Sequence, residues 1–109
     1  MNSRAGLIAL VLTAIACDAT SGAEPINRDS CAQRCAQARA DWMVQHRRRW
    51  HPPFRIGHVW RHARFEGVGW GGPNRLQLGT CRPRRRGMRL VGDAFARGSR
   101  MTARVRLWR

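Results

Sequence analysis

The sequence predicts a small α+β domain, in which one amphipathic helix packs on a short antiparallel sheet behind an N-terminal export signal. A helical repeat follows residue 30 and stops at Pro52-Pro53, and apolar residues alternate with polar ones near the C-terminus. The chain has 109 residues, which is enough for one small core and too few for two. We therefore expect a single domain over residues 24–109.

Residues 1–23 have the order of a signal peptide. Arg4 supplies a basic start and residues 5–16 carry no charge, while Ser21 and Ala23 are the small residues expected before a cleavage site. The apolar stretch is about 12 residues long, whereas a membrane-spanning helix needs about 20. This pattern predicts cleavage after Ala23 and a secreted or periplasmic protein with no transmembrane segment in its mature chain.

A lipoprotein signal is the alternative to this cleavage. Cys17 directly follows Ala14-Ile15-Ala16, and a lipidated cysteine would tether the mature protein to a membrane. Both readings place the domain outside the cytoplasm, where disulfides persist.

A helix is expected over about residues 31–46. Ser30 is the expected N-cap, Gln33 would complete a capping box, and the charge of Asp29 favours the helix start. The helix should end by His51, because two prolines follow. The spacing of Cys31, Cys35, Ala38 and Trp42 predicts that these four residues lie on one face of the helix.

The rest of the chain is expected to form an irregular connection and then the sheet, over about residues 65–109. Residues 52–64 show no period, and the glycines of Phe65–Pro73 suggest a bulged strand or a backbone that something approaches closely. Residues 101–108 alternate as a half-buried strand does, and residues 88–96 are their expected hairpin partner.

Three cysteines remain after the signal peptide. A bond from Cys81 to Cys35, or alternatively to Cys31, would close a loop of roughly 50 residues and stabilise the domain by about 4 kcal/mol in the chain-entropy view. Three is an odd number, so one thiol stays outside this predicted disulfide.

The charge points to anionic partners. All 21 basic residues are arginine and the net charge is +15 at pH 7, so nonspecific binding of polyanions at low salt is expected. A genome rich in G and C would also favour arginine codons, and this second cause stays open. The candidate polyanion-binding residues are Arg47, Arg48, Arg49, Arg84, Arg85 and Arg86.

Little in the sequence supports catalysis, a cofactor or a metal. Glu66 and Asp93 are the only acids after residue 41, and no nucleophile motif, phosphate loop or carboxylate pair is present. His58 and His62 have the spacing of helical zinc ligands, but the zinc-protease glutamate is missing and arginines surround them. We predict a protein that is not an enzyme and carries neither cofactor nor metal.

Several short motifs carry a family resemblance over about 75 residues, from Cys35 to the end. They are Gly57-His58-Val59, Arg64 to Trp70, Thr80-Cys81, Gly87 to Leu90, Gly92-Asp93-Ala94, Ala96-Arg97-Gly98 and Val105 to Arg109. In these the chain resembles a group of small exported bacterial proteins of unknown function. That group in turn resembles a shortened CAP domain, of the cysteine-rich secretory, antigen 5 and pathogenesis-related proteins.

The resemblance implies a cut-down α/β/α sandwich. His58 and Glu66 would then stand for the first His and first Glu of the CAP cavity, and Glu66-Gly67 for the Gly-Glu-Asn box of that family. The sequence is too short for a full CAP domain, so helices of that fold would be missing.

Two functions follow as hypotheses. The first is a secreted, disulfide-stapled, non-enzymatic module whose ligand is unknown and whose binding residues are His58, Glu66, Gly67 and Gly69. The alternative is a cationic protein that binds envelope polymers, anionic lipid or nucleic acid through its arginine runs. A hydrolase that uses His58 and Glu66 is a third and weaker hypothesis.

Overall fold

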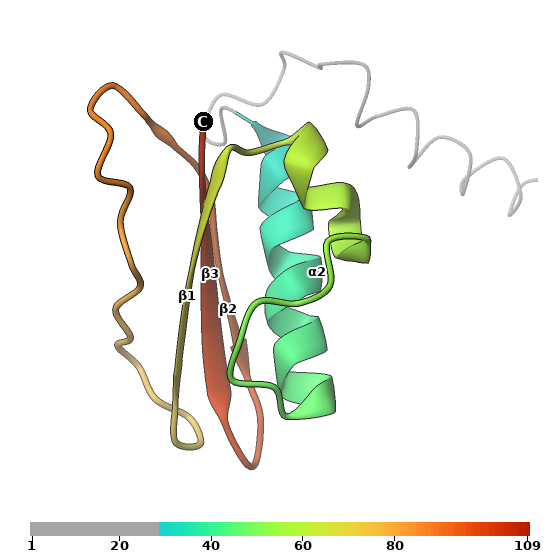
Figure 1. The fold of residues 1–109 in the computed structure, drawn as a ribbon. Coiled ribbons are helices and arrows are strands. Elements are labelled where there is room, and N and C mark those ends of the chain that lie inside the picture. Colours follow the sequence, from blue (N-terminus) through green and yellow to red (C-terminus); the bar gives the residue numbers. More distant parts are fainter. Residues whose placement is uncertain (1–28) are drawn as a thin grey trace, which may run out of the picture.

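The computed structural model describes residues 29–109, which form one helix, one short 3-10 helix and a three-stranded antiparallel sheet (Figure 1). The elements are α2 (Ser30–His46), η1 (Ile56–Arg61), β1 (Phe65–Gly71), β2 (Leu90–Arg97) and β3 (Thr102–Trp108). The α+β prediction is confirmed. The predicted signal peptide, its cleavage site and Cys17 lie outside the described residues.

The sheet has the strand order β1-β3-β2, so the last strand of the chain lies in the centre. Helix α2 covers one face and contacts β2 and β3, with η1 beside it, and residues 72–89 run along the opposite face (Figure 1). Val105 of β3 pairs with Val68 on one side and Ala94 on the other. These three side chains belong to the core between the sheet and α2.

The predicted hairpin forms near the C-terminus. Strands β2 and β3 pair along their length, and the turn is closed by the Gly98 amide, which donates to the Met101 carbonyl at 2.8 Å. The strands begin one or two residues later than their alternating pattern suggested.

Helix α2 begins at Ser30, but its N-cap is Asp29 and not Ser30. The Asp29 Oδ1 accepts a hydrogen bond from the Ala32 amide at 2.9 Å. Gln33 forms no capping box, because its side chain reaches across to β2. It accepts from the Asp93 amide and donates to the Asp93 carbonyl, both at 2.8 Å.

These glutamine contacts cover an exposed sheet edge. Gln37 repeats the arrangement one turn later by donating to the Phe95 carbonyl at 2.8 Å. Since β2 lies at the edge of the sheet, its outward backbone groups would otherwise be open to pairing with another chain. Two glutamines at helical spacing therefore protect the edge.

The buried face of α2 is rotated from the predicted one. Of the four predicted residues only Cys35 is buried, while Ala38 is exposed and Cys31 and Trp42 are half-buried. The buried positions are Ala32, Cys35, Ala36, Arg39, Ala40 and Met43. Alanines let the helix lie so close to the sheet that a Cβ on Gly92 would be 2.7 Å from the Ala32 carbonyl oxygen.

The glycines of β1 are needed because residues 79–81 of the chain itself approach them. A Cβ at Gly67 would lie 2.2 Å from the Cys81 carbonyl oxygen, and one at Gly69 would lie 2.0 Å from that of Gly79. Both glycines are buried. The close approach expected from the sequence is present, but the approaching group is the protein's own backbone, so Gly67 and Gly69 are covered and do not line a ligand surface.

We expect Gly69→Ala to destabilise the fold by about 1–3 kcal/mol, because the new methyl group must displace backbone and not a flexible side chain. Gly72→Ala is the matched control, since no atom lies within 4 Å of its added Cβ. The measurement is the free energy of unfolding in urea. Equal stability of the two variants would show that residues 79–81, part of the segment 72–89 that we call the strap, do not pack on β1 as described.

Candidate functional site

Of the residues predicted as a ligand site, Glu66 meets a buried guanidinium, that of Arg39. Arg39 is 1% exposed and uses every N–H group that it has. Its Nη1 donates to the carbonyls of Pro53 at 2.9 Å and Ile56 at 2.8 Å, and its Nη2 donates to that of Pro52 at 2.8 Å. The remaining donors, Nε and Nη2, bind the two carboxylate oxygens of Glu66.

Glu66 is placed on β1 with its side chain toward α2, and only 3% of that side chain is exposed. Its Oε1 accepts from Arg39 Nη2 at 2.9 Å and from His51 Nδ1 at 2.8 Å, while its Oε2 accepts from Arg39 Nε. The contact with a carboxylate requires His51 to carry its proton on Nδ1. Glu66 thus acts as the counter-ion of Arg39.

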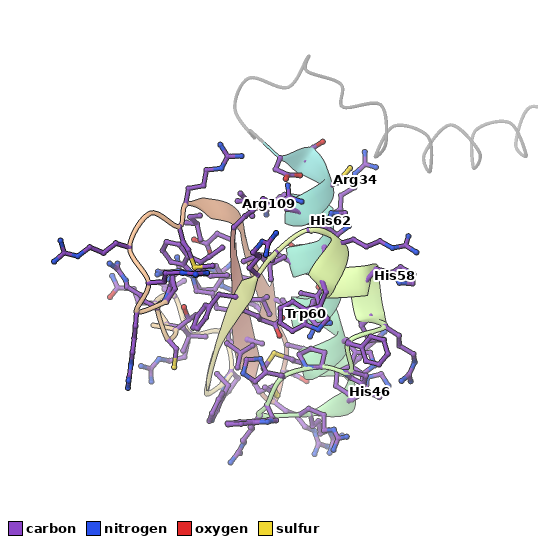
Figure 2. The ribbon with its side chains drawn as sticks, turned by 45° about the horizontal axis from the view of Figure 1, so that its top comes forward. Arg34, His46, His58, Trp60, His62 and Arg109 are labelled. Atoms are coloured by element: carbon purple, nitrogen blue, oxygen red, sulfur yellow. The ribbon has the colours of Figure 1, made fainter. Side chains whose placement is uncertain are left out.

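His58 does not line the cavity that Glu66 lines, although the CAP resemblance would place both in one cavity. His58 is exposed, with a left-handed backbone (φ 52°), and Figure 2 shows it on the outer side of η1, away from the sheet. His51, from the loop after α2, takes the place expected for His58. The histidine that reaches this carboxylate therefore comes from the loop and not from η1.

Sequence reasoning missed both Arg39 and His51. Arg39 lies four residues after Cys35 and four before Met43, so it falls on the buried stripe once the helix face is correctly chosen. A charge at such a position needs a buried partner, and Glu66 was one of few acids available. The small number of acidic residues was therefore the feature of the sequence that could have indicated the pairing of Arg39 with Glu66.

The two free cysteines do not form the predicted disulfide. Cys35 is buried and Cys81 is exposed. Cys35 lies in the core on the α2 side of the sheet, whereas Cys81 belongs to the strap on the opposite face (Figure 1). The sheet separates the two thiols, and with Cys81 free the alternative bond to Cys31 is not formed either.

Burial raises the pKa of the Cys35 thiol to about 11; the charge of Arg39 lowers this pKa by a smaller amount, and that of Glu66 raises it. We expect iodoacetamide at pH 8 to alkylate Cys81 and leave Cys35 unmodified until the protein is unfolded, because the thiolate is the reactive form. Peptide mass spectrometry before and after addition of denaturant gives the result. Recovery of a Cys35–Cys81 linked peptide would instead restore the disulfide prediction.

The arginine runs lie at opposite ends of the molecule. Arg47 to Arg49 directly follow α2, at the end where the side chain of Val44 lies against Gly98 of the hairpin turn. Arg84 to Arg86 lie on the strap, toward the end where Arg89 pairs with Arg109 (Figure 1). All six are exposed, and none forms an ion pair with a carboxylate of residues 29–109.

Arg104, in contrast, forms its contacts within the fold. Arg104 forms a two-bond pair with Asp93, at 2.8 and 2.7 Å, and also donates to the Leu78 carbonyl at 2.7 Å. The hydrogen bond to Asp93 raises the pKa of Arg104. This contact fixes the strap to the outer face of the sheet, so the strap presents its own arginines from a defined position.

Comparison with known proteins identifies no relative: no family model matches the chain, and no curated protein or solved structure is detectably similar to it. The resemblance to a shortened CAP domain stays a prediction. Residues 29–109 contain no group of three or more His, Cys, Asp or Glu placed to hold a metal ion. Within the same range, no helix combines the length and the apolarity that a bilayer span requires.

We expect Arg39→Met to cost about 3–5 kcal/mol of stability, because Glu66 is then left as a buried charge without a counter-ion. The double variant Arg39→Met with Glu66→Leu should recover part of this loss. Arg109→Gln is the control, since it removes a more exposed pair with Asp29, worth at most about 1 kcal/mol. Urea unfolding followed by Trp fluorescence measures these variants together with the single variant Glu66→Leu, and simple additivity of the two buried substitutions would contradict the pairing.

Proposed function

We propose that this protein is a non-enzymatic cationic module that binds polyanions through arginines held on a small α+β scaffold. The observation that carries the proposal is the contrast between two groups of arginines. Arg39 and Arg104 have carboxylate partners inside the fold, while both exposed runs have none among residues 29–109. Charges without internal partners are available to external anions.

The alternative of a ligand site at His58, Glu66, Gly67 and Gly69 has less support. Glu66 is buried and bound by Arg39 and His51, and the strap covers the two glycines. His58 is exposed and lies on the outer side of η1 (Figure 2). An exported location remains our expectation from residues 1–23, and anionic polymers or lipids of a cell envelope are then the natural partners.

The scaffold also places aromatic rings among the charges. Trp50 is 67% exposed and directly follows Arg47 to Arg49. Arginine and an exposed indole together can contact phosphates and stack on bases or other flat groups. Single-stranded nucleic acid is therefore a suitable laboratory probe, although the proposal concerns polyanions as a class.

The test is the affinity for an oligodeoxythymidylate as a function of salt. We expect the affinity to fall steeply with salt, and the triple variant Arg84→Gln, Arg85→Gln and Arg86→Gln to reduce the slope of log K against log salt by about 2, since each phosphate contact contributes about 0.7. The equivalent variant of Arg47, Arg48 and Arg49 should act similarly.

The matched control replaces Arg84, Arg85 and Arg86 by Lys, which keeps the charge and should keep most of the slope. Binding that does not respond to salt, or a slope that neither glutamine variant changes, would refute the proposal.

A further inference from the structure

Two cavities adjoin on the side of the molecule that carries η1. The larger has a volume of about 530 Å³ and the smaller about 290 Å³, and both are lined by Trp60 and Arg64. These volumes fall in the range of small-molecule sites. Because they share two side chains, the cavities are neighbours, and we refer to the two together as the groove and to each as one of its compartments.

The larger compartment is basic. Its guanidinium groups come from three separate parts of the chain: Arg64 precedes β1, Arg85 lies on the strap and Arg109 follows β3. No carboxylate side chain lines it. Of the three, only Arg109 has a carboxylate partner among residues 29–109, the Asp29 Oδ2 at 3.4 Å. Convergence of three guanidinium groups on one cavity, two of them without a carboxylate partner in this range, favours a compact anion such as phosphate or carboxylate.

The smaller compartment is mainly apolar. Pro52, Phe54, Val59 and Phe65 line it, and its floor is the pair of Arg39 and Glu66. That pair is internally satisfied, so it offers no free charge to a ligand. Phe54 is 70% exposed and Trp60, at the boundary, is 60% exposed (Figure 2). Large exposed aromatic surface beside a cavity is typical of a binding site.

We infer that the groove binds one molecule of an anionic amphiphile, with its phosphate or carboxylate in the basic compartment and its alkyl or ring portion between Phe54 and Trp60. Each compartment suits one end of such a ligand, and the shared Trp60 and Arg64 join the two ends. The inference goes beyond polyanion binding and does not depend on it, because it requires no polymer and involves only one arginine of the two exposed runs, Arg85.

The test compares octyl phosphate, below its micelle concentration, with inorganic phosphate and octanol by isothermal titration calorimetry. We expect octyl phosphate to bind at least about tenfold more tightly than either, because only it fills both compartments. If octyl phosphate binds no more tightly than inorganic phosphate, or if octanol binds equally well, the two-compartment site is refuted.

Single substitutions locate the site. Arg85→Gln should weaken both phosphates about tenfold, while Phe54→Ser should weaken octyl phosphate and leave inorganic phosphate unchanged. Both residues are exposed, so the variants should fold, and circular dichroism verifies this. Arg47→Gln lies outside both cavities and is the matched control. If Arg47→Gln weakens phosphate binding as much as Arg85→Gln does, the binding reflects the overall positive charge of the protein, and the proposed site is refuted.

The same ligand chemistry occurs in free amphiphiles and in lipid head groups. Vesicles that contain phosphatidic acid distinguish the sources. Binding of both vesicles and octyl phosphate, with the same loss in Arg85→Gln, supports the site with a bilayer lipid as ligand, whereas octyl phosphate binding alone supports it with a free amphiphile. The glutamine variant of Arg47, Arg48 and Arg49 separates this inference from the proposed function. It should lose oligodeoxythymidylate binding and keep octyl phosphate binding.

Discussion

The guanidinium of Arg39 lies between α2, the loop of residues 50–56 and β1, and hydrogen bonds hold it to the last two of these. Three of those bonds go to loop carbonyls and two to Glu66. Pro52 and Pro53 cannot donate backbone hydrogen bonds, but their carbonyls still need partners when buried. Arg39 supplies those partners, so the irregular segment after α2 has a defined path without regular secondary structure.

Several other features depend on this arrangement. The fixed loop brings His51 to Glu66 and positions Phe54 at the edge of the smaller cavity. It also places η1 against α2, with Val59 in the core. A buried ion pair gives uncertain net stability compared with apolar packing, yet removal of one partner is costly. Its main effect here is therefore on the geometry of the surface that carries the aromatic rings.

The opposite face of the sheet is organised by charge as well. Arg104 binds Asp93 and the Leu78 carbonyl, which attaches the strap across the sheet, and the glycines of β1 let the strap backbone come close. With so few acids in the chain, these internal pairs use Glu66 and Asp93. The exposed arginines are left without carboxylates in the described part of the chain, and this surplus connects the architecture with anion binding.

The sequence by itself determined the α+β class, the helix up to His46, the C-terminal hairpin and the excess of arginine, because these follow from local periodicity, proline positions and composition. It also indicated a close approach at the β1 glycines. Only the tertiary structure decided which group approaches, which helix face is buried, and that Glu66 binds Arg39 and His51 and not His58. These choices depend on contacts between segments distant in sequence, and no local pattern specifies which of many arginines meets a rare carboxylate.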